Sequence, residues 1–299
     1  DSLGSNTTGD RNCAFGFNSL DDNTTADYNS AFGMNGLSAN TTGSLNVAVG
    51  RNALAANTTA SENTSVGVES LENNQTGQQN CAFGFRALED NDANHNTALG
   101  HEALKENTTG TQNTAVGADI MIANTTGSNN VAMGFKALDA NTTASENVAI
   151  GAFSLSANTT GTQNVSLGYQ ALEANTTANS NTAVGYKSLE ANVTGANNTA
   201  VGADALKLNT GGDNTAVGSI TLDANTTGHS NAAFGRNSLG ANTTGASNTA
   251  LGTSALSNNT TSSNNTAVGD NAMLTANGSQ HSTAVGRRAL YALTTGNYN

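Results

Sequence analysis

Asn113-Thr114-Ala115-Val116-Gly117 is the stretch that decides the fold, because the same pattern returns down the whole chain. It reads Asn-Val-Ala-Ile-Gly at residues 147–151 and Asn-Thr-Ala-Val-Gly at residues 181–185. The full unit is Thr-Ala-Val-Gly-x-x-Ala-Leu-x-Ala-Asn-Thr-Thr-Gly-x-x-Asn, 17 residues long, and its positions are numbered 1 to 17 below. A fixed short period predicts an array in which each unit packs on its neighbours.

The repeat accounts for the entire chain. A partial unit covers residues 1–12 and 17 units run from residue 13 to residue 299, of which those beginning at Cys81 and Thr199 are one residue short. We therefore expect residues 1–299 to form a single repeat array. The first residues match the second half of a unit and neither end carries an atypical capping repeat, so we expect a fragment of a longer fibre.

The pattern of each unit favours strands over helices. Gly at position 4 of every unit and the Asn-Thr-Thr-Gly segment both oppose a helix. We predict two short strands per unit, at positions 17 to 3 and 5 to 8, with a bend at the Gly and a return through Asn-Thr-Thr-Gly. In-register stacking then gives an all-β parallel β-solenoid of 17-residue coils. Stacked Asn side chains at positions 11 and 17 are expected to hydrogen-bond along the array.

Positions 2 and 3 suggest that the chain associates with copies of itself. Position 3 is apolar in every unit and is expected to fill the core, whereas position 2 is restricted to Ala and Ser. Adjacent strand residues point to opposite faces, so both faces are predicted to be buried, the second against another chain. Lys187, at position 6, is predicted to be exposed. The predicted interface consists of Ala115, Ala149, Ala183, Ala200 and Ala216.

The recurring phrase Asn-x-Ala-(Val/Ile)-Gly-x-x-(Ala/Ser)-Leu resembles the repeats of two related groups of fibrous proteins, and residues 182–189, Thr-Ala-Val-Gly-Tyr-Lys-Ser-Leu, are very similar to those of the second. One is the head of trimeric autotransporter adhesins; the other is the phage tail-fibre and mosaic fibre proteins that end in a self-cleaving chaperone domain. The resemblance implies a left-handed β-roll, an intertwined or side-by-side homotrimer, and an extracellular, cell-surface or virion location. It also implies a structural or adhesive role, as the shaft or head of a fibre that projects or forms a receptor-binding surface.

Charge and hydropathy narrow the range of partners. The net charge of −12 and the pI of about 4.5 argue against a nucleic-acid partner and against electrostatic binding to an anionic membrane. No apolar stretch approaches the roughly 20 residues of a membrane span. The expected partners are other copies of the chain and a cell-surface glycan or receptor.

No group of residues indicates catalysis, a metal or a cofactor. The four histidines show no metal-ligand spacing and are expected on the surface. Cys13 and Cys81 share position 1 four units apart, which at about 4.8 Å per strand places them roughly 19 Å from each other. That separation excludes an intrachain disulfide, and we interpret both as buried thiols. We expect no enzyme activity.

The Asn-Thr-Thr turns suggest the alternative of an ice-binding or glycan-coated extracellular solenoid. Asn277 begins a sequon shifted by one residue from the others, and ladders of Thr could order water. Asn-x-Thr is an N-glycosylation sequon, although sugars on every coil would be crowded. The in-register candidates are Asn6, Asn23, Asn40, Asn57, Asn74, Asn107, Asn124, Asn141, Asn158, Asn175, Asn192, Asn225, Asn242 and Asn259.

Overall fold

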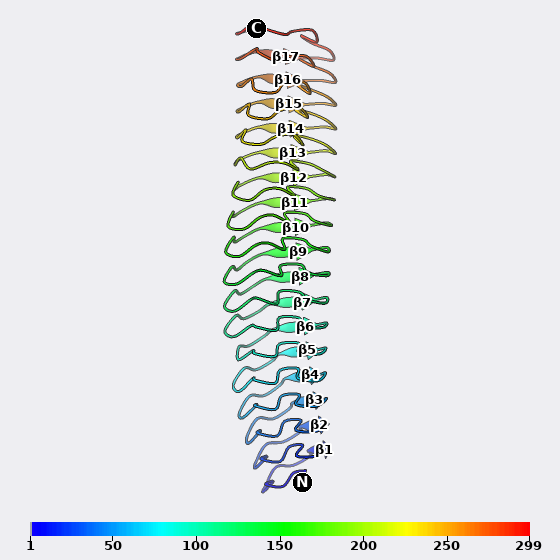
Figure 1. Cartoon of the computed structure of the whole chain (residues 1–299), viewed down its shortest axis with the longest axis vertical. Helices are drawn as coiled ribbons and strands as arrows, with labels where there is room; N and C mark the ends of the chain where they lie inside the picture. The colour runs from blue at the N-terminus through cyan, green and yellow to red at the C-terminus, as the bar shows by residue number, and fades with distance from the viewer. Residues whose placement is uncertain (1) are drawn as a thin grey trace. The chain divides into compact units, whose positions relative to one another are not determined.

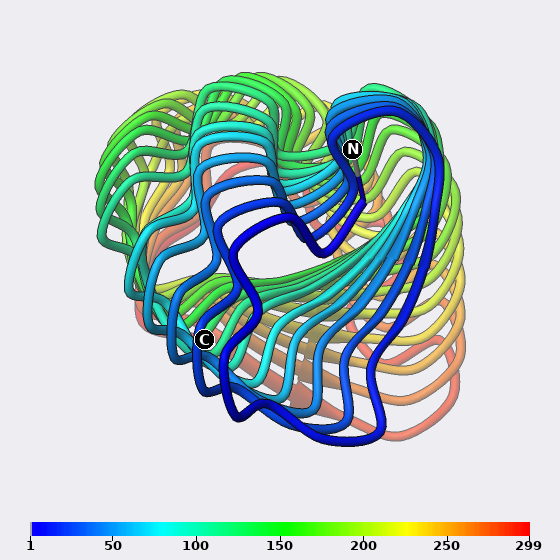
Figure 2. The ribbon, with the colours of Figure 1, turned by 90° about the horizontal axis from the view of Figure 1, so that it is seen from below.

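The structure, a computed structural model, describes residues 2–299, and within that range it contains strands and turns but no helix. The chain divides into two compact blocks, Asp1–Asn147 and Val148–Asn299. Both blocks are parallel β-solenoids with the 17-residue coil that the sequence predicts (Figure 1). Within each block, successive coils follow almost the same path when viewed from below (Figure 2).

Each coil contributes one strand of three residues, at positions 1 to 3. The strands of the N-terminal block are β1 (Cys13–Phe15), β2 (Ser30–Phe32), β3 (Val47–Val49), β4 (Thr64–Val66), β5 (Cys81–Phe83), β6 (Thr97–Leu99), β7 (Thr114–Val116) and β8 (Val131–Met133). Those of the C-terminal block are β9 (Val148–Ile150), β10 (Val165–Leu167), β11 (Thr182–Val184), β12 (Thr199–Val201), β13 (Thr215–Val217), β14 (Ala232–Phe234), β15 (Thr249–Leu251), β16 (Thr266–Val268) and β17 (Thr283–Val285).

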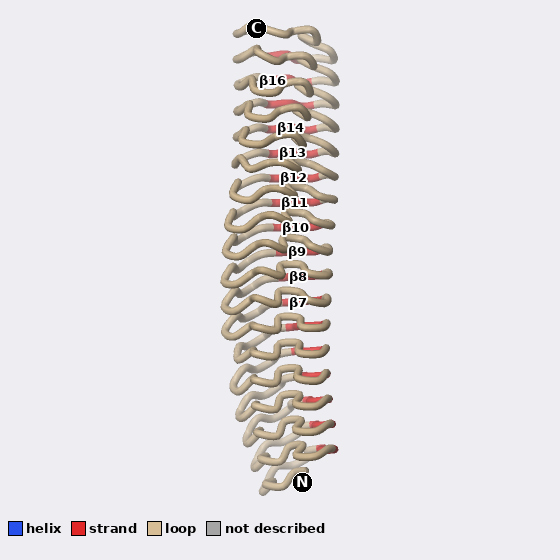
Figure 3. Tube along the Cα trace, viewed as in Figure 1, coloured by secondary structure: helices blue, strands red, loops and turns tan. Residues whose placement is uncertain are grey.

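Neighbouring strands within a block pair in parallel and in register. Thr97, Ala98 and Leu99 of β6 face residues 114, 115 and 116 of β7, and the same pattern holds along each block. All strands lie on one side of their coils, and turns form the rest of each coil (Figure 3). Each block therefore has one continuous sheet surface that consists of positions 1 to 3.

The second strand predicted at positions 5 to 8 is absent, and this part of the prediction is wrong. Positions 6 and 8 adopt left-handed backbone angles, as in Lys187 with φ 53° and Leu189 with φ 53°. The N–H of Lys187 donates to the Tyr169 carbonyl at 3.0 Å, and the N–H of Leu189 to the Ala205 carbonyl at 3.0 Å. The backbone N–H groups of positions 6 and 8 thus donate to the preceding and the following coil, respectively. These hydrogen bonds satisfy the backbone polar groups without a pleated strand.

The interior of the coil is filled by positions 2, 7 and 8. Leu at position 8 is fully buried from Leu20 to Leu256, and the alanines at position 2 are buried from Ala31 to Ala284. Positions 2 and 7 face each other across the coil, since a Cβ built on Gly36 would lie 3.7 Å from the Ala31 Cβ. The pair Ser65 and Ser70 confirms this placement, because their hydroxyls hydrogen-bond across the same gap. Close approach of the two walls of one coil explains why position 2 must be small.

The predicted interface alanines are therefore inside the chain, and the prediction that they contact a second copy is wrong. Ala115, Ala149, Ala183, Ala200 and Ala216 each have 0% of their surface exposed. Position 3, which was expected to form the core, points outward instead: Phe83 is 48% exposed and Leu99 47% exposed. The constraint on position 2 comes from the opposite wall of the same coil.

Gly at position 4 ends each strand with a bend that only Gly accommodates. Gly117 has φ 150°, and a Cβ added there would lie 2.6 Å from the carbonyl oxygen of Gly134 in the next coil. Both the backbone angle and the close approach of the neighbouring coil exclude a side chain.

Two buried ladders of Asn side chains hold the coils together, as the sequence predicted. At position 17, the Oδ1 of Asn113 accepts from the backbone N–H of Asn130 at 3.0 Å, and the Asn130 Nδ2 donates to the Ala144 carbonyl at 2.9 Å. At position 11, the Asn124 Nδ2 donates to the Asn107 Oδ1 at 2.7 Å. These bonds satisfy polar groups that the narrow coil buries.

Candidate functional site

The in-register sequons, except that of Asn6, are closed to modification in the folded chain. Thirteen of the fourteen asparagines are fully buried at position 11, where Nδ2, the atom that would carry a glycan, donates to other groups in the coil. Asn124 Nδ2, for example, bonds to Asn107 Oδ1 and to the Gly127 carbonyl at 3.1 Å. Asn6 alone among the fourteen is exposed. The glycan-coated alternative is thereby corrected for Asn23, Asn40, Asn57, Asn74, Asn107, Asn124, Asn141, Asn158, Asn175, Asn192, Asn225, Asn242 and Asn259.

Asn277 differs because its sequon is shifted by one position. Ala276 occupies position 11 there and is fully buried, so Asn277 stands at position 12 and is exposed. Its Oδ1 accepts from the hydroxyl of Thr260 at 2.7 Å. Burial of a sequon asparagine thus depends on its position in the unit.

Outward-facing side chains at position 3 form an apolar strip along the strands; together with position 1, which is most often Thr, they make up what we call the strand face. In the N-terminal block the strip includes Phe15, Phe32, Val49, Phe83, Leu99 and Met133, and in the C-terminal block Leu167, Val201, Phe234, Leu251 and Val285. Isolated apolar residues are ordinary on a protein surface, but a contiguous row marks an interaction surface.

Both cysteines belong to the strand face. Cys13 and Cys81 are exposed free thiols at position 1, so their interpretation as buried side chains is wrong. The error has the same origin as the misplaced interface, because the sequence did not show which strand positions point inward.

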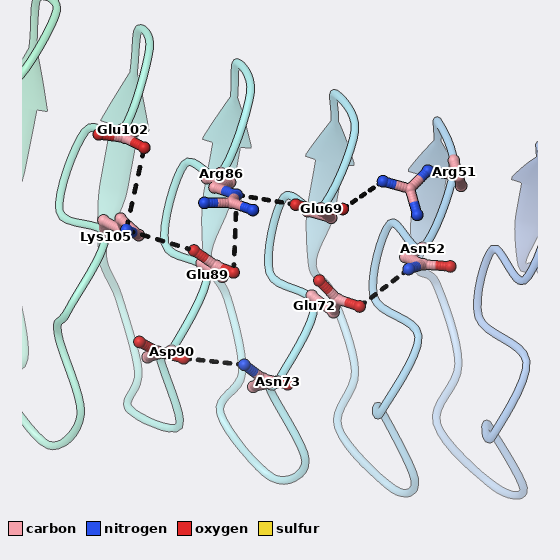
Figure 4. Close-up of polar contacts among 10 residues, drawn as sticks. All are labelled: Arg51, Asn52, Glu69, Glu72, Asn73, Arg86, Glu89, Asp90, Glu102 and Lys105. Carbon is pink, nitrogen blue, oxygen red and sulfur yellow. Dashed lines mark hydrogen bonds and ion pairs between the residues drawn. The ribbon is translucent and has the colours of Figure 1, made fainter.

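The N-terminal block carries a ladder of ion pairs on positions 5, 6 and 9 of successive coils (Figure 4). Glu69 lies between Arg51 and Arg86, and its Oε2 is 2.8 Å from the Arg86 Nε. Glu89 is 3.8 Å from Arg86 and 4.0 Å from Lys105. The Arg51–Glu69, Glu69–Arg86 and Glu89–Lys105 pairs each join neighbouring coils, so attraction between opposite charges links the coils along this face.

The two carboxylates in this ladder respond differently to their surroundings. The hydrogen bond from Arg86, reinforced by Arg51, holds the pKa of Glu69 below its usual value. Burial raises the pKa of Glu89, and Arg86 only partly offsets this effect. Glu69 is thus stabilised as an anion, whereas Glu89 is penalised for its charge.

The C-terminal block presents two stacked tyrosines, which we call the tyrosine pair. Tyr169 and Tyr186, both at position 5, are 44% and 51% exposed, and their ring centroids lie 5.7 Å apart with planes inclined by 10°. Phe153 meets Tyr169 edge-on at 6.2 Å. The tyrosine pair is therefore an ordered aromatic surface outside the core.

A charged cluster lies beside the tyrosine pair. Lys187 contacts Glu190 at 2.8 Å, and Lys207 lies 3.8 Å from Glu190 and 3.2 Å from Asp204. Lys187, predicted to be exposed, is half-buried in this cluster, and its Nζ lies 5.7 Å from the Tyr186 ring centroid. The hydrogen bond to Glu190 raises the pKa of Lys187.

Potential metal ligands occur in two groups, and neither forms an enclosed site. Glu69, Glu72 and Glu89 lie together, but Arg51, Arg86 and Lys105 already neutralise this group. His101, Glu102 and Asp119 form the other group at the surface. All four histidines are exposed, as predicted, and no pocket occurs among residues 2–299.

Neither the ion-pair ladder nor the tyrosine pair was identified from the sequence. Alignment of the units on one another would have revealed the ion-pair ladder, because position 6 is Glu69, Arg86 and Glu102 in successive coils. Position 5 likewise reads Tyr in two successive coils, at Tyr169 and Tyr186. Side chains one unit apart in sequence are neighbours in a solenoid, so variable positions matter as much as constant ones.

Within residues 2–299, the chain lacks a helix with the length and hydrophobicity needed to cross a membrane. No protein-family model matches the sequence, and no match is found among curated proteins.

Proposed function

We propose that the chain is a structural and adhesive segment of an extracellular fibre, the shaft or head of an assembly like the trimeric adhesins and phage tail fibres. In this proposal the coils form a left-handed β-roll and three copies associate through their strand faces. The assembly projects a receptor-binding tip or binds a cell-surface receptor along its side.

The exposed strand face carries the proposal. Residues such as Phe83 and Leu99 are about half exposed although they stand in the most regular part of the coil. Burial of apolar surface is worth about 25 cal/mol per Å², so a row of such side chains provides a substantial driving force for association. The strand face also repeats coil by coil, which suits a partner with the same axial spacing, and another copy of the chain has that spacing.

Native mass and substitution on the strand face test the proposal. Sedimentation equilibrium should give a multiple of the 29.9 kDa chain mass, with three as the expected number. The double variant Phe83→Glu/Leu99→Glu should lower that mass and retain the circular dichroism of the parent, because both side chains lie outside the coil. Thr109→Glu, at an exposed turn position, is the matched control and should leave the mass unchanged. A monomeric parent protein would refute the proposal.

Ice binding remains the second candidate, and the exposed threonines at position 13 favour it. Thr109, Thr126 and Thr143 are exposed at the same position in successive coils. At position 12 the hydroxyls are already engaged, as in Thr108, which donates to the Thr125 carbonyl at 3.0 Å. Thermal hysteresis of the parent, lost in a triple Thr→Lys variant at position 13, would support ice binding; no hysteresis would exclude it.

A further inference from the structure

We propose that the tyrosine pair and its charged cluster bind a neutral pyranose of an oligosaccharide. The inference rests on the proposed adhesive function and identifies where on the chain a glycan would bind. It starts from the position of the rings, which contribute little to the fold because they lie outside the core.

The Tyr186 ring is 51% exposed, and the Lys187 Nζ lies over it at 5.7 Å from the ring centroid. Tyr169 covers one face of the Tyr186 ring, and the next coil carries only the short, exposed Ala203 at the same position. On the other side, Tyr169 has Ala152 at the same position of the neighbouring coil, and Phe153 meets its ring edge-on at 6.2 Å. A flat ring of similar size can therefore stack on the exposed part of Tyr186, beside the small Ala203.

The charged cluster supplies hydrogen-bonding groups at the edge of the tyrosine pair. Asp204 follows Ala203 directly, and Lys207 and Glu190 lie within 4.0 Å of their ion-pair partners in the cluster. Each carboxylate has free lone pairs and each ammonium group has further donors, so hydroxyl groups can bind without breaking the ion pairs.

The sign of the charges selects a neutral ligand. Lys187 and Lys207 balance Glu190 and Asp204 within the cluster, so a strongly anionic or cationic sugar gains no net attraction. The described residues form no pocket, so this surface cannot enclose a small ligand. It suits an extended ligand that is held by many polar contacts. A neutral oligosaccharide offers apolar C–H faces to the rings and hydroxyl groups to the cluster.

The tyrosine pair lies beyond the bend that ends each strand. Gly185, with φ 136°, separates the strand-face residue Val184 from Tyr186. A ligand on Tyr186 and a second copy on the strand face thus use different residues, so association and sugar binding can be tested separately.

The test uses the whole chain and a panel of neutral cello-, malto-, chito- and galacto-oligosaccharides, with binding followed by saturation-transfer NMR and tyrosine fluorescence. At least one member of the panel should bind, and Tyr186→Ala should weaken that binding by about tenfold. Phe135→Ala, which removes an exposed aromatic at position 5 of the N-terminal block, is the matched control and should retain binding.

Native mass, measured on the same samples, separates this proposal from the proposed function. Sugar binding that Tyr186→Ala weakens at unchanged native mass supports the site. Absence of binding to the whole panel, or binding that Tyr186→Ala leaves intact, overturns it while the fibre proposal stands. A lower native mass for Tyr186→Ala would show that the tyrosine pair contacts another copy, which also overturns it.

Discussion

Replacement of one buried ladder asparagine, Asn130→Ala, tests how strongly the polar ladders hold the coils together. The Asn130 side chain accepts from the backbone N–H of Asn147 at 3.0 Å and donates to the Ala144 carbonyl at 2.9 Å and to the Asn113 Oδ1 at 3.1 Å. All of these groups lie in the same block and are buried.

The structure shows which of these groups would lose its partner. The Ala144 carbonyl keeps a donor in the Asn141 Nδ2 at 3.0 Å, and the Asn113 Oδ1 keeps the backbone N–H of residue 130. The N–H of Asn147 loses the acceptor that the Asn130 Oδ1 provides. The substitution removes three buried hydrogen bonds at about 1 kcal/mol each, so we expect a loss of about 2–4 kcal/mol.

Equilibrium unfolding in urea, followed by circular dichroism and by hydrogen exchange, measures this loss. Asn73→Ala is the control: its side chain is exposed and pairs only with Asp90 at 2.8 Å, so we expect a change of about 0–1 kcal/mol. Hydrogen exchange should accelerate most in the coils next to residue 130, because stability in a repeat array is set by nearest neighbours. If both variants unfold like the parent, the ladders do not determine stability and the reasoning is refuted.

Four further predictions concern other positions of the repeat. Gly117→Ala should destabilise the chain by about 2–5 kcal/mol, because the new Cβ strains the backbone and meets the Gly134 carbonyl oxygen at 2.6 Å. Ala183→Leu should destabilise folding by about 1–3 kcal/mol through overpacking of the coil interior. Asp223→Asn should raise the unfolding midpoint at neutral pH, because burial raises the pKa of this carboxyl and penalises its charged form. Expression through an N-glycosylating secretory pathway should give misfolded chains that inhibition of glycosylation restores, because the modified asparagines belong in the interior.

Each of these predictions has an outcome that contradicts it. Parent-like thermal stability of Gly117→Ala or Ala183→Leu would mean that the coils separate more easily than their spacing implies. For Asp223, a raised pKa favours the neutral folded form, so the advantage of Asn must shrink as the pH falls through that pKa; a constant advantage would contradict the assignment. Folded chains that carry glycans on any of the thirteen buried sequon asparagines would contradict the burial of position 11.

Acid should also weaken the ion-pair ladder. The pKa of Glu69 is lowered in the folded chain, so its contribution is present above the unfolded pKa and is lost as the pH falls through the folded value. The side chains of its partners Arg51 and Arg86 are 47% and 36% exposed, and added salt should reduce the same contribution.

The sequence by itself determined the period, the parallel stacking and the Asn ladders. A 17-residue repeat brings equal positions together in successive coils, and constant Gly and Asn residues mark where the backbone bends and where polar groups are buried. The small Gly at position 4 and the Asn at positions 11 and 17 have the roles that their chemistry suggested.

Only the tertiary structure decided which side of the strand faces inward. Positions 2 and 3 alternate, and the sequence offered two apolar faces of different size: Ala183 is buried, whereas its larger neighbour Val184 lies on the outside. The coil is so narrow that positions 2 and 7 meet near van der Waals distance, leaving room inside for Ala and for Leu from position 8. The larger residue is therefore on the surface, because the width of the coil, rather than hydrophobicity, selects which side chain is enclosed.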